Sequence, residues 1–228
     1  QGHMNLTSAN SINVARFLPQ AFYYFNAYAQ AKKLGKADNL TICVPSGNFG
    51  NITAGLFAQR MGLPIMNFIA ANNANDIFYN YLLSGIYSPK ASIQTIANAM
   101  DVGDPSNFAR ILDLYKSSHA EICNHISGAT YSDDEIAATM KKCYEQTGYV
   151  LDPHGACGYQ ALKDNLKEGE TGVFLETAHP AKFKEKVDAI LSTDIEIPTR
   201  LADFMKGKKQ SLEMAADFSA FKQFLLSV

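Results

Sequence analysis

The chain alternates short apolar runs with longer stretches whose apolar residues recur at helical spacing. The runs at 39–45 and 64–71 are short and β-rich, and they predict buried strands. Between them, residues 51–61 have the pattern of a helix, which we expect to end at Gly62 with Pro64 just beyond. A strand, a helix and a strand within about 33 residues form a βαβ unit, which predicts that both strands are parallel in one sheet.

Helical spacing also extends through 11–34, ahead of this unit. Pro19 lies inside that stretch, so we expect a kink or two helices, with Asn10 or Ser11 as the N-cap. Ser132 and Glu135 have the spacing of a capping box. The remaining pattern predicts helices near 76–83, 106–119, 133–147, 154–166, 180–191 and 217–226, an irregular stretch over 85–110, and a third buried strand at 172–177. These elements indicate an α/β fold in three layers, with a mostly parallel sheet flanked by helices.

Composition narrows the classes of function. The chain has 228 residues, of which 47% are hydrophobic and 18% charged, and its net charge is −2. It therefore lacks the basic surface of nucleic-acid-binding proteins, and no apolar run reaches the roughly 18 residues that span a bilayer. The four cysteines, at 43, 123, 143 and 157, lack metal-ligand spacing. In a chain of this size they indicate reduced, mostly buried thiols of a cytoplasmic protein without a metal site.

The turn between the first strand and the next helix, Ser46–Asn51 (SGNFGN), has a composition that a plain turn does not need. Gly47 and Gly50 allow close approach of the backbone, and the helix N-terminus offers free N–H groups. Asn48 and Asn51 add uncharged donors. The turn matches neither the nucleotide P-loop nor the dinucleotide signature GxGxxG. It suits one small phosphate held by dipoles, with a purely structural strand-to-helix turn as an equal alternative.

Five segments make the assignment more specific. They are NSINVARFLPQ (10–20), VPSGNFGN (44–51), NAMDVGDPSNFAR (98–110), LDPHGA (151–156) and ETAHPAKF (176–183). In this order they resemble segments of the threonine synthase family, pyridoxal-phosphate (PLP) enzymes of the tryptophan-synthase-β-like fold, also called fold type II. The resemblance covers nearly all of 5–220 and is closest to the form found in bacteria and fungi. It implies PLP as cofactor and, for a complete enzyme, conversion of O-phospho-L-homoserine and water to L-threonine and phosphate.

The resemblance also implies roles for particular residues. The PLP phosphate would be held by Ser46, Gly47, Asn48, Phe49, Gly50 and Asn51. Thr177 would face the pyridine nitrogen, where a hydroxyl moderates the electron-withdrawing power of the ring; the alternative is a strand-end threonine bonded to the backbone. Asn10, Ser11 and Arg16 match the segment that contacts the substrate phosphate, for which an arginine is a bidentate partner. The alternative interpretation is that Asn10 and Ser11 are helix caps and that Arg16 is a solvated surface charge.

Polar residues near these segments have less specific interpretations. For His154 and His179, hydrogen bonding to the backbone is favoured over catalysis. Asp152 and Glu176 are expected at strand ends, where they organise asparagine or backbone groups or are solvated. His119 and His125 are expected in a helical region without a chemical role.

The family's Schiff-base lysine precedes the NSIN segment and adjoins a phenylalanine and an aspartate, and no such stretch occurs in this sequence. Lys182 and Lys184 are instead predicted to be exposed charges. Residues 1–4 (QGHM) resemble the remnant of a cloning tag. We therefore expect 5–228 to be the C-terminal PLP-binding domain, inactive alone. Its partners would be O-phosphohomoserine, the N-terminal part of the same enzyme and, as one option, a second copy.

Other functions stay open. A serine or threonine dehydratase or a cysteine synthase would share the fold and the glycine-rich turn but lack NSINxAR and NAMDVGDPSN. A non-catalytic phosphometabolite-binding domain would keep the turn without the chemistry, and a purely structural α/β domain would bind no ligand. Titration with phosphate or PLP, with Ser46→Ala and Asn48→Ala as controls, separates binding from non-binding proteins.

Overall fold

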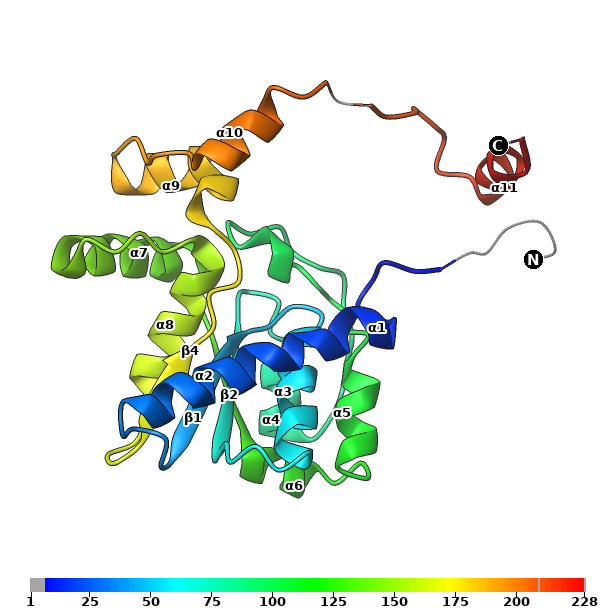
Figure 1. Ribbon diagram of the computed structural model, residues 1–228. Helices are drawn as coiled ribbons and strands as arrows, with labels where there is room; N and C mark the ends of the chain where they lie inside the picture. The colour runs from blue at the N-terminus through cyan, green and yellow to red at the C-terminus, as the bar shows by residue number, and fades with distance from the viewer. Residues whose placement is uncertain (1–6, 209, 228) are drawn as a thin grey trace. The chain divides into compact units, whose positions relative to one another are not determined.

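The computed structural model describes residues 7–208 and 210–227 and divides into two units. One unit is Ala9–Ile195, and the other combines the described residues that precede Ala9 with those that follow Ile195. The predicted tag at 1–4 lies outside the described residues. The larger unit contains the sheet shown in Figure 1, and it is the unit that carries the site.

The sheet has four parallel strands in the order β3-β2-β1-β4. They are β1 (Leu40–Pro45), β2 (Asn67–Asn72), β3 (Ile126–Thr130) and β4 (Thr171–Phe174). The predicted parallel βαβ unit is confirmed, with Cys43 of β1 in register with Ile69 of β2 and Phe174 of β4. Strand β3 was not predicted, because its sequence ISGAT has one large apolar residue and resembles no buried strand. Strand β4 ends at Phe174, earlier than the predicted 177.

The predicted break at Pro19 is confirmed. Helix α1 (Val14–Phe17) and helix α2 (Ala21–Lys33) are joined by a 3-10 turn, η1 (Leu18–Gln20). The prediction of Asn10 or Ser11 as N-cap is wrong. The cap is Asn13, which has an extended backbone and whose side chain accepts a hydrogen bond from the backbone N–H of Ala15 at 3.0 Å.

The other helices largely match the sequence pattern. They are α3 (Gly50–Arg60), α4 (Ile77–Ser84), α5 (Phe108–Leu114), α6 (His119–His125), α7 (Asp133–Thr147), α8 (Pro153–Asn165) and α9 (Lys184–Leu191), with 3-10 turns η2 (Asn98–Met100) and η3 (Pro180–Phe183). The capping box of Ser132 and Glu135 is confirmed at α7. The helix predicted over 106–119 is shorter, because Lys116 and Ser117 adopt positive φ angles of 51° and 57° just beyond α5. In the second unit, α11 (Phe218–Ser227) was predicted and α10 (Thr199–Met205) was not.

Two hydrophobic clusters cover the two faces of the sheet and give the predicted three layers. Leu40, Ile42 and Val44 alternate along β1 and pack in a cluster with side chains of α2, α3, α4, α5 and α6. Cys43 belongs to a second cluster with side chains of α7, α8 and α9. Figure 1 shows α2 passing in front of β1 and β2. Full burial stabilises the fold by about 1.5–3 kcal/mol for each large aliphatic side chain.

Two further sequence expectations concern membranes and thiols. Among the helices that the structure describes, none has both the length and the apolar character needed to cross a bilayer. Cys43, Cys143 and Cys157 are buried, Cys123 is exposed, and all four are free thiols. This agrees with the expectation of reduced, mostly buried cysteines.

Candidate functional site

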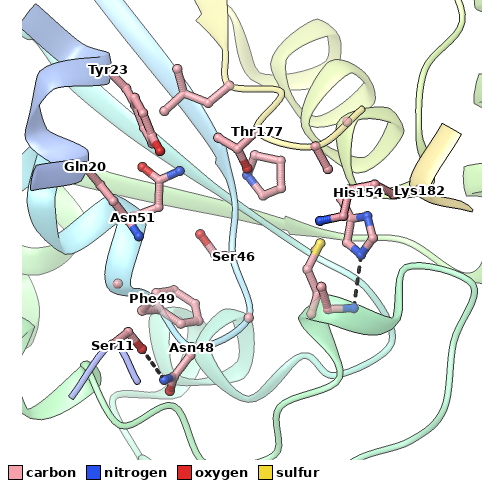
Figure 2. Close-up of a pocket in the computed structure, with 18 of the residues that line it drawn as sticks. Ser11, Gln20, Tyr23, Ser46, Asn48, Phe49, Asn51, His154, Thr177 and Lys182 are labelled. Carbon is pink, nitrogen blue, oxygen red and sulfur yellow. Dashed lines mark hydrogen bonds between the residues drawn. The ribbon is translucent and has the colours of Figure 1, made fainter. Parts of the chain in front are cut away.

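The candidate site lies where the parallel strands end. The turn from Ser46 to Phe49 connects the end of β1 to the start of α3, and Thr177 lies three residues after the end of β4. Because β4 is the parallel neighbour of β1, both segments emerge at the same edge of the sheet. They line one cavity of about 380 Å³ together with η2, the start of α8 and η3 (Figure 2).

The backbone amides that follow Ser46 in the turn have no hydrogen-bond acceptor within the described protein, and residues 47–51 line the cavity. Phe49, the residue before α3, has a left-handed conformation with φ 61° and ψ 12°, which is uncommon for a residue with a side chain. Within the described chain, no backbone or side-chain acceptor receives a hydrogen bond from the N–H groups of residues 47–52. Helix α3 therefore begins with uncapped amides at the positive end of its dipole, a geometry that binds anions.

Neighbouring protein segments leave no room for a side chain at Gly47 and little room at Gly50. A Cβ atom on Gly47 would lie 2.7 Å from the Cα of Met100 and 3.0 Å from the carbonyl oxygen of Ala99. A Cβ atom on Gly50 would lie 3.1 Å from the Cβ of Ser11. Both glycines were predicted to allow close approach to a ligand, and in the structure they also make room for η2 and for the segment around Ser11.

Asn48 connects the turn to two other segments. Its side-chain amide donates to the hydroxyl of Ser11 at 2.6 Å, and its side-chain carbonyl accepts from the backbone N–H and hydroxyl of Ser106 at 2.7 and 2.8 Å. The buried Asn107 donates to the backbone carbonyl of Asn48 at 2.8 Å and to the Ser11 hydroxyl at 3.2 Å. Arg110 donates to the carbonyls of Ser11 and Ile12 at 3.1 and 2.5 Å. This network holds Ser11 against the turn (Figure 2).

Ser46 and Asn51 use part of their hydrogen-bonding capacity inside the fold. Ser46 is buried, its N–H donates to the carbonyl of Ala71, and its hydroxyl donates to the carbonyl of Val44, each at 2.8 Å. Its donors are thus directed into the sheet, unlike those of residues 47–52. The hydroxyl of the buried Tyr24 donates to Asn51, whose backbone carbonyl oxygen and side-chain oxygen both lie 2.9 Å away. This bond orients the Asn51 amide group at the cavity lining.

The residues predicted to bind the substrate phosphate lie beside the turn. Ser11 and Arg16 line both the first cavity and a second one of about 610 Å³, and Asn10 lines the second. Arg16 is exposed, and its Nε donates to the carbonyl of Ala9 at 3.0 Å. No aspartate or glutamate of the described chain lines either cavity. The charged lining is therefore entirely basic, which favours anionic ligands.

The histidines are bonded to the backbone, the interpretation that sequence analysis favoured. His154 is buried, its Nε2 accepts from the N–H of Ala99 at 3.0 Å, and its Nδ1 lies 2.6 Å from Oδ1 of Asp152. Because an N–H donates to Nε2, the Nδ1 carries the proton and donates to Asp152. His154 thereby holds η2 against Gly47 (Figure 2). His179 caps η3, its Nδ1 accepting from the N–H of Ala181 at 3.1 Å.

The carboxylates expected near the site organise the backbone. Asp152 is the N-cap of α8 and accepts from the N–H of His154 at 2.8 Å. Glu176 is half-buried and accepts from the N–H of Asp152 at 3.1 Å and from the hydroxyl of Tyr149 at 2.7 Å. Burial raises the pKa of the Glu176 carboxyl above its ordinary value. Neither acid lines the cavity.

Among the lining residues that were not predicted as site residues, Lys182 is the one that carries an ammonium. Lys182 was predicted to be an exposed charge, and it is exposed, yet it also lines the first cavity. Lys184, by contrast, forms ion pairs with Asp188 and Asp194. Lys182 and Lys184 differ because Lys182 belongs to the 3-10 turn η3 at the cavity, whereas Lys184 is the first residue of α9.

The residues present fit a phosphate-bearing aromatic cofactor such as PLP. The turn offers several backbone donors that no described protein group uses, and the lining has positive but no negative side chains. Thr177 adds a hydroxyl on β4's side of the cavity. An anion at the turn and a hydrogen-bonding ring atom near Thr177 would satisfy both sets of donors.

Comparisons with known proteins agree with this geometry. The family model described as "Pyridoxal-phosphate dependent enzyme" matches residues 5–177, and the model described as "Threonine synthase, C-terminal" matches residues 155–225. The threonine synthase of Haemophilus influenzae is 48% identical over 223 residues, which are 98% of this chain and 52% of that protein.

Comparison with solved structures also finds threonine synthases. The crystal structure of threonine synthase from Escherichia coli has a TM-score of 0.89 and 43% identity, covering 97% of this chain and 51% of that one. The PLP-bound threonine synthase of Brucella melitensis has a TM-score of 0.87 and 35% identity, covering 96% of this chain and 52% of that one. The chain therefore spans about half the length of the relatives it matches.

Proposed function

Because the chain belongs to the pyridoxal-phosphate dependent enzymes and, among them, to the threonine synthases, we propose that it forms the C-terminal PLP-binding domain of such an enzyme. The domain would comprise residues 5–228. The proposed reaction of the complete enzyme is conversion of O-phospho-L-homoserine and water to L-threonine and phosphate. The observation that supports this function most is the set of unused amides at residues 47–51 in a cavity without acidic side chains.

The turn provides the proposed phosphate site. Gly47, Asn48, Phe49, Gly50 and Asn51 would bind the cofactor phosphate through backbone amides, with the Asn51 side chain at the edge. Ser46 would contribute by holding the turn on the sheet, because its N–H and hydroxyl donate to strand carbonyls. The amides are already oriented by α3 and by the contacts of Gly47 and Gly50, so binding requires little reorganisation.

Thr177 would face the ring nitrogen. When bound, PLP supplies an electron-withdrawing ring that stabilises negative charge developing on the amino-acid substrate. A threonine hydroxyl bonds to that nitrogen without requiring it to be protonated, whereas a carboxylate would hold a proton there. This residue would therefore moderate the strength of the ring as an electron acceptor.

Asn10, Ser11 and Arg16 would bind the phosphate of O-phosphohomoserine. Arg16 carries a guanidinium at both cavities, and arginine forms paired hydrogen bonds with phosphate oxygens. Ser11 is positioned by Asn48 and Asn107, which places the substrate segment next to the cofactor turn. The two phosphates would then bind on adjacent sides of Asn48.

The Schiff-base lysine is proposed to come from outside these residues, in the half of the relatives' length that this chain does not match. The chain alone would accordingly be catalytically inert, and it would require the N-terminal part of the enzyme as its partner. Exposed apolar side chains on α1 and α2, including Val14 and Phe22, are candidates for that contact or for a homodimer. The free cysteines support a cytoplasmic location, and the relatives in bacteria support a bacterial source.

The alternative enzymes receive less support. The identities of 43 and 48% are to threonine synthases, and the C-terminal family model carries the same description. A serine or threonine dehydratase or a cysteine synthase would explain the turn but not that match. A non-catalytic phosphometabolite-binding domain would give a different result in binding experiments, because it would bind phosphate without preferring ligands that carry the PLP ring.

Titration of the chain with PLP, pyridoxal and inorganic phosphate tests the proposal. We expect weak binding in the order PLP, then phosphate, then pyridoxal, and no release of phosphate from O-phosphohomoserine. Equal affinity for PLP and pyridoxal would contradict the phosphate site. A lysine–PLP absorbance band that borohydride abolishes would contradict the absence of a Schiff-base lysine, provided that it survives Lys182→Gln.

A further inference from the structure

Lys182 occupies a defined place on the cavity wall. After β4 the chain passes Thr177, and His179 caps the 3-10 turn η3 that contains Lys182. The Lys182 ammonium lies 5.8 Å from the centroid of the Phe183 ring, and that ring lies 4.7 Å from the imidazole of His154. His154 in turn holds Ala99, which packs on Gly47. Lys182, His154 and Ser11 all line this cavity (Figure 2).

The charge of Lys182 is not neutralised by protein groups. Within residues 7–208 and 210–227, Lys182 forms no ion pair, and no acidic side chain lines its cavity. The two nearby lysines, Lys184 and Lys186, do have partners in the protein. Lys184 pairs with Asp188, and Lys186 donates to the carbonyl of Thr95 at 3.4 Å. Lys182 is therefore the one lysine of the described chain that presents an unpaired ammonium to this cavity.

We infer that the Lys182 ammonium pairs with the phosphate dianion bound at the Gly47 side of the turn. The inference rests on the proposed function, since it concerns the cofactor phosphate. The turn alone offers amide dipoles, which solvate an anion without cancelling its charge. A single ammonium at the edge of a partly enclosed cavity supplies one of the two positive charges that would compensate a dianion. Arg16, on the side of Ser11, remains for the anionic group of the substrate.

The inference is tested with ligands that cannot react with lysine. Pyridoxine 5′-phosphate and pyridoxine carry an alcohol where PLP and pyridoxal carry an aldehyde, so neither forms an imine with Lys182. Calorimetric titration of the 228-residue chain gives the ratio of their affinities. Lys182→Gln removes the charge, Lys182→Arg keeps it, and Lys141→Gln on α7 removes a charge from an exposed lysine that does not line the cavity.

We expect Lys182→Gln to weaken the binding of pyridoxine 5′-phosphate about three- to tenfold and to leave the affinity for pyridoxine unchanged. Lys182→Arg should retain most of the affinity for pyridoxine 5′-phosphate, and Lys141→Gln should retain all of it. Added salt should reduce the preference of the wild type for pyridoxine 5′-phosphate over pyridoxine. Unchanged affinity in Lys182→Gln would overturn the pairing while leaving the phosphate site intact. Equal loss for both ligands would assign Lys182 to the ring instead of the phosphate. If the wild type does not distinguish the two ligands, the proposed function itself is wrong, and the pairing with it.

Discussion

Replacement of Gly47 by alanine tests how tightly η2 and the turn depend on each other. The added methyl would lie 2.7 Å from the Cα of Met100, roughly 0.7 Å inside ordinary carbon–carbon contact. Both close neighbours, Met100 Cα and Ala99 O, are backbone atoms, so no side-chain rotation relieves the contact. Either the turn or η2 must move, and movement of η2 would lengthen the 3.0 Å hydrogen bond from Ala99 to His154.

The expected magnitude follows from these two terms. Insertion of a methyl into a packed site costs about 1–3 kcal/mol, and loss of a hydrogen bond to a buried ring adds about 1 kcal/mol. We therefore expect Gly47→Ala to lower the free energy of unfolding by about 2–4 kcal/mol and to abolish binding of pyridoxine 5′-phosphate. Urea denaturation followed by circular dichroism measures the first effect, and calorimetric titration measures the second.

Gly50→Ala is the matched control. Its methyl would approach a side-chain atom, Ser11 Cβ, at 3.1 Å, and Ser11 can shift more easily than a backbone segment. Its cost should therefore be clearly smaller, about 1 kcal/mol. The reasoning fails if Gly47→Ala is as stable as the wild type, or if Gly50→Ala is the more damaging of the two.

Three further predictions concern groups around the turn. His154→Ala should destabilise the chain by about 2–4 kcal/mol in urea titrations and weaken phosphate-ester binding through the loss of the Ala99 contact, whereas an effect on stability alone would contradict its positioning role. Tyr24→Phe should lower the free energy of unfolding by about 1–2 kcal/mol and weaken the binding of pyridoxine 5′-phosphate a few-fold, because Asn51 loses its buried hydrogen-bond partner. Unchanged affinity would show that Asn51 does not contribute to binding of this ligand. Glu176→Gln should flatten the pH dependence of unfolding above pH 4.5. The raised pKa means that the native chain binds more protons than the unfolded one, so wild-type stability falls as pH rises through that range, and a variant with the same pH slope would refute this.

Local rules predicted the elements whose signals lie within a few residues. The break at Pro19, the capping box at Ser132 and the parallel βαβ unit around the turn all depend on short-range geometry or on connection handedness. The resemblance of five segments then indicated which residues surround the cavity, and the structure places Thr177 and Arg16 there. These predictions needed no knowledge of tertiary contacts.

The unpredicted features depend on residues far apart in sequence. Asn48 bonds to Ser11 and Ser106, and His154 to Ala99, and none of these pairings leaves a local pattern. Strand β3 is polar and glycine-containing, and it forms because β2 offers a free edge for pairing. Lys182 looked like one more surface charge in ETAHPAKF until η3 placed it on the cavity wall.

The central claim is that the amides of residues 47–51 bind a phosphate at the end of β1. Two-dimensional ¹H–¹⁵N NMR of the labelled chain during titration with pyridoxine 5′-phosphate tests it residue by residue. The account predicts the largest saturable shifts at the amides of Gly47, Phe49 and Gly50, which are absent when pyridoxine is used. If these amides keep their frequencies at saturating ligand, or if the largest shifts fall in residues that line neither cavity, the account is contradicted.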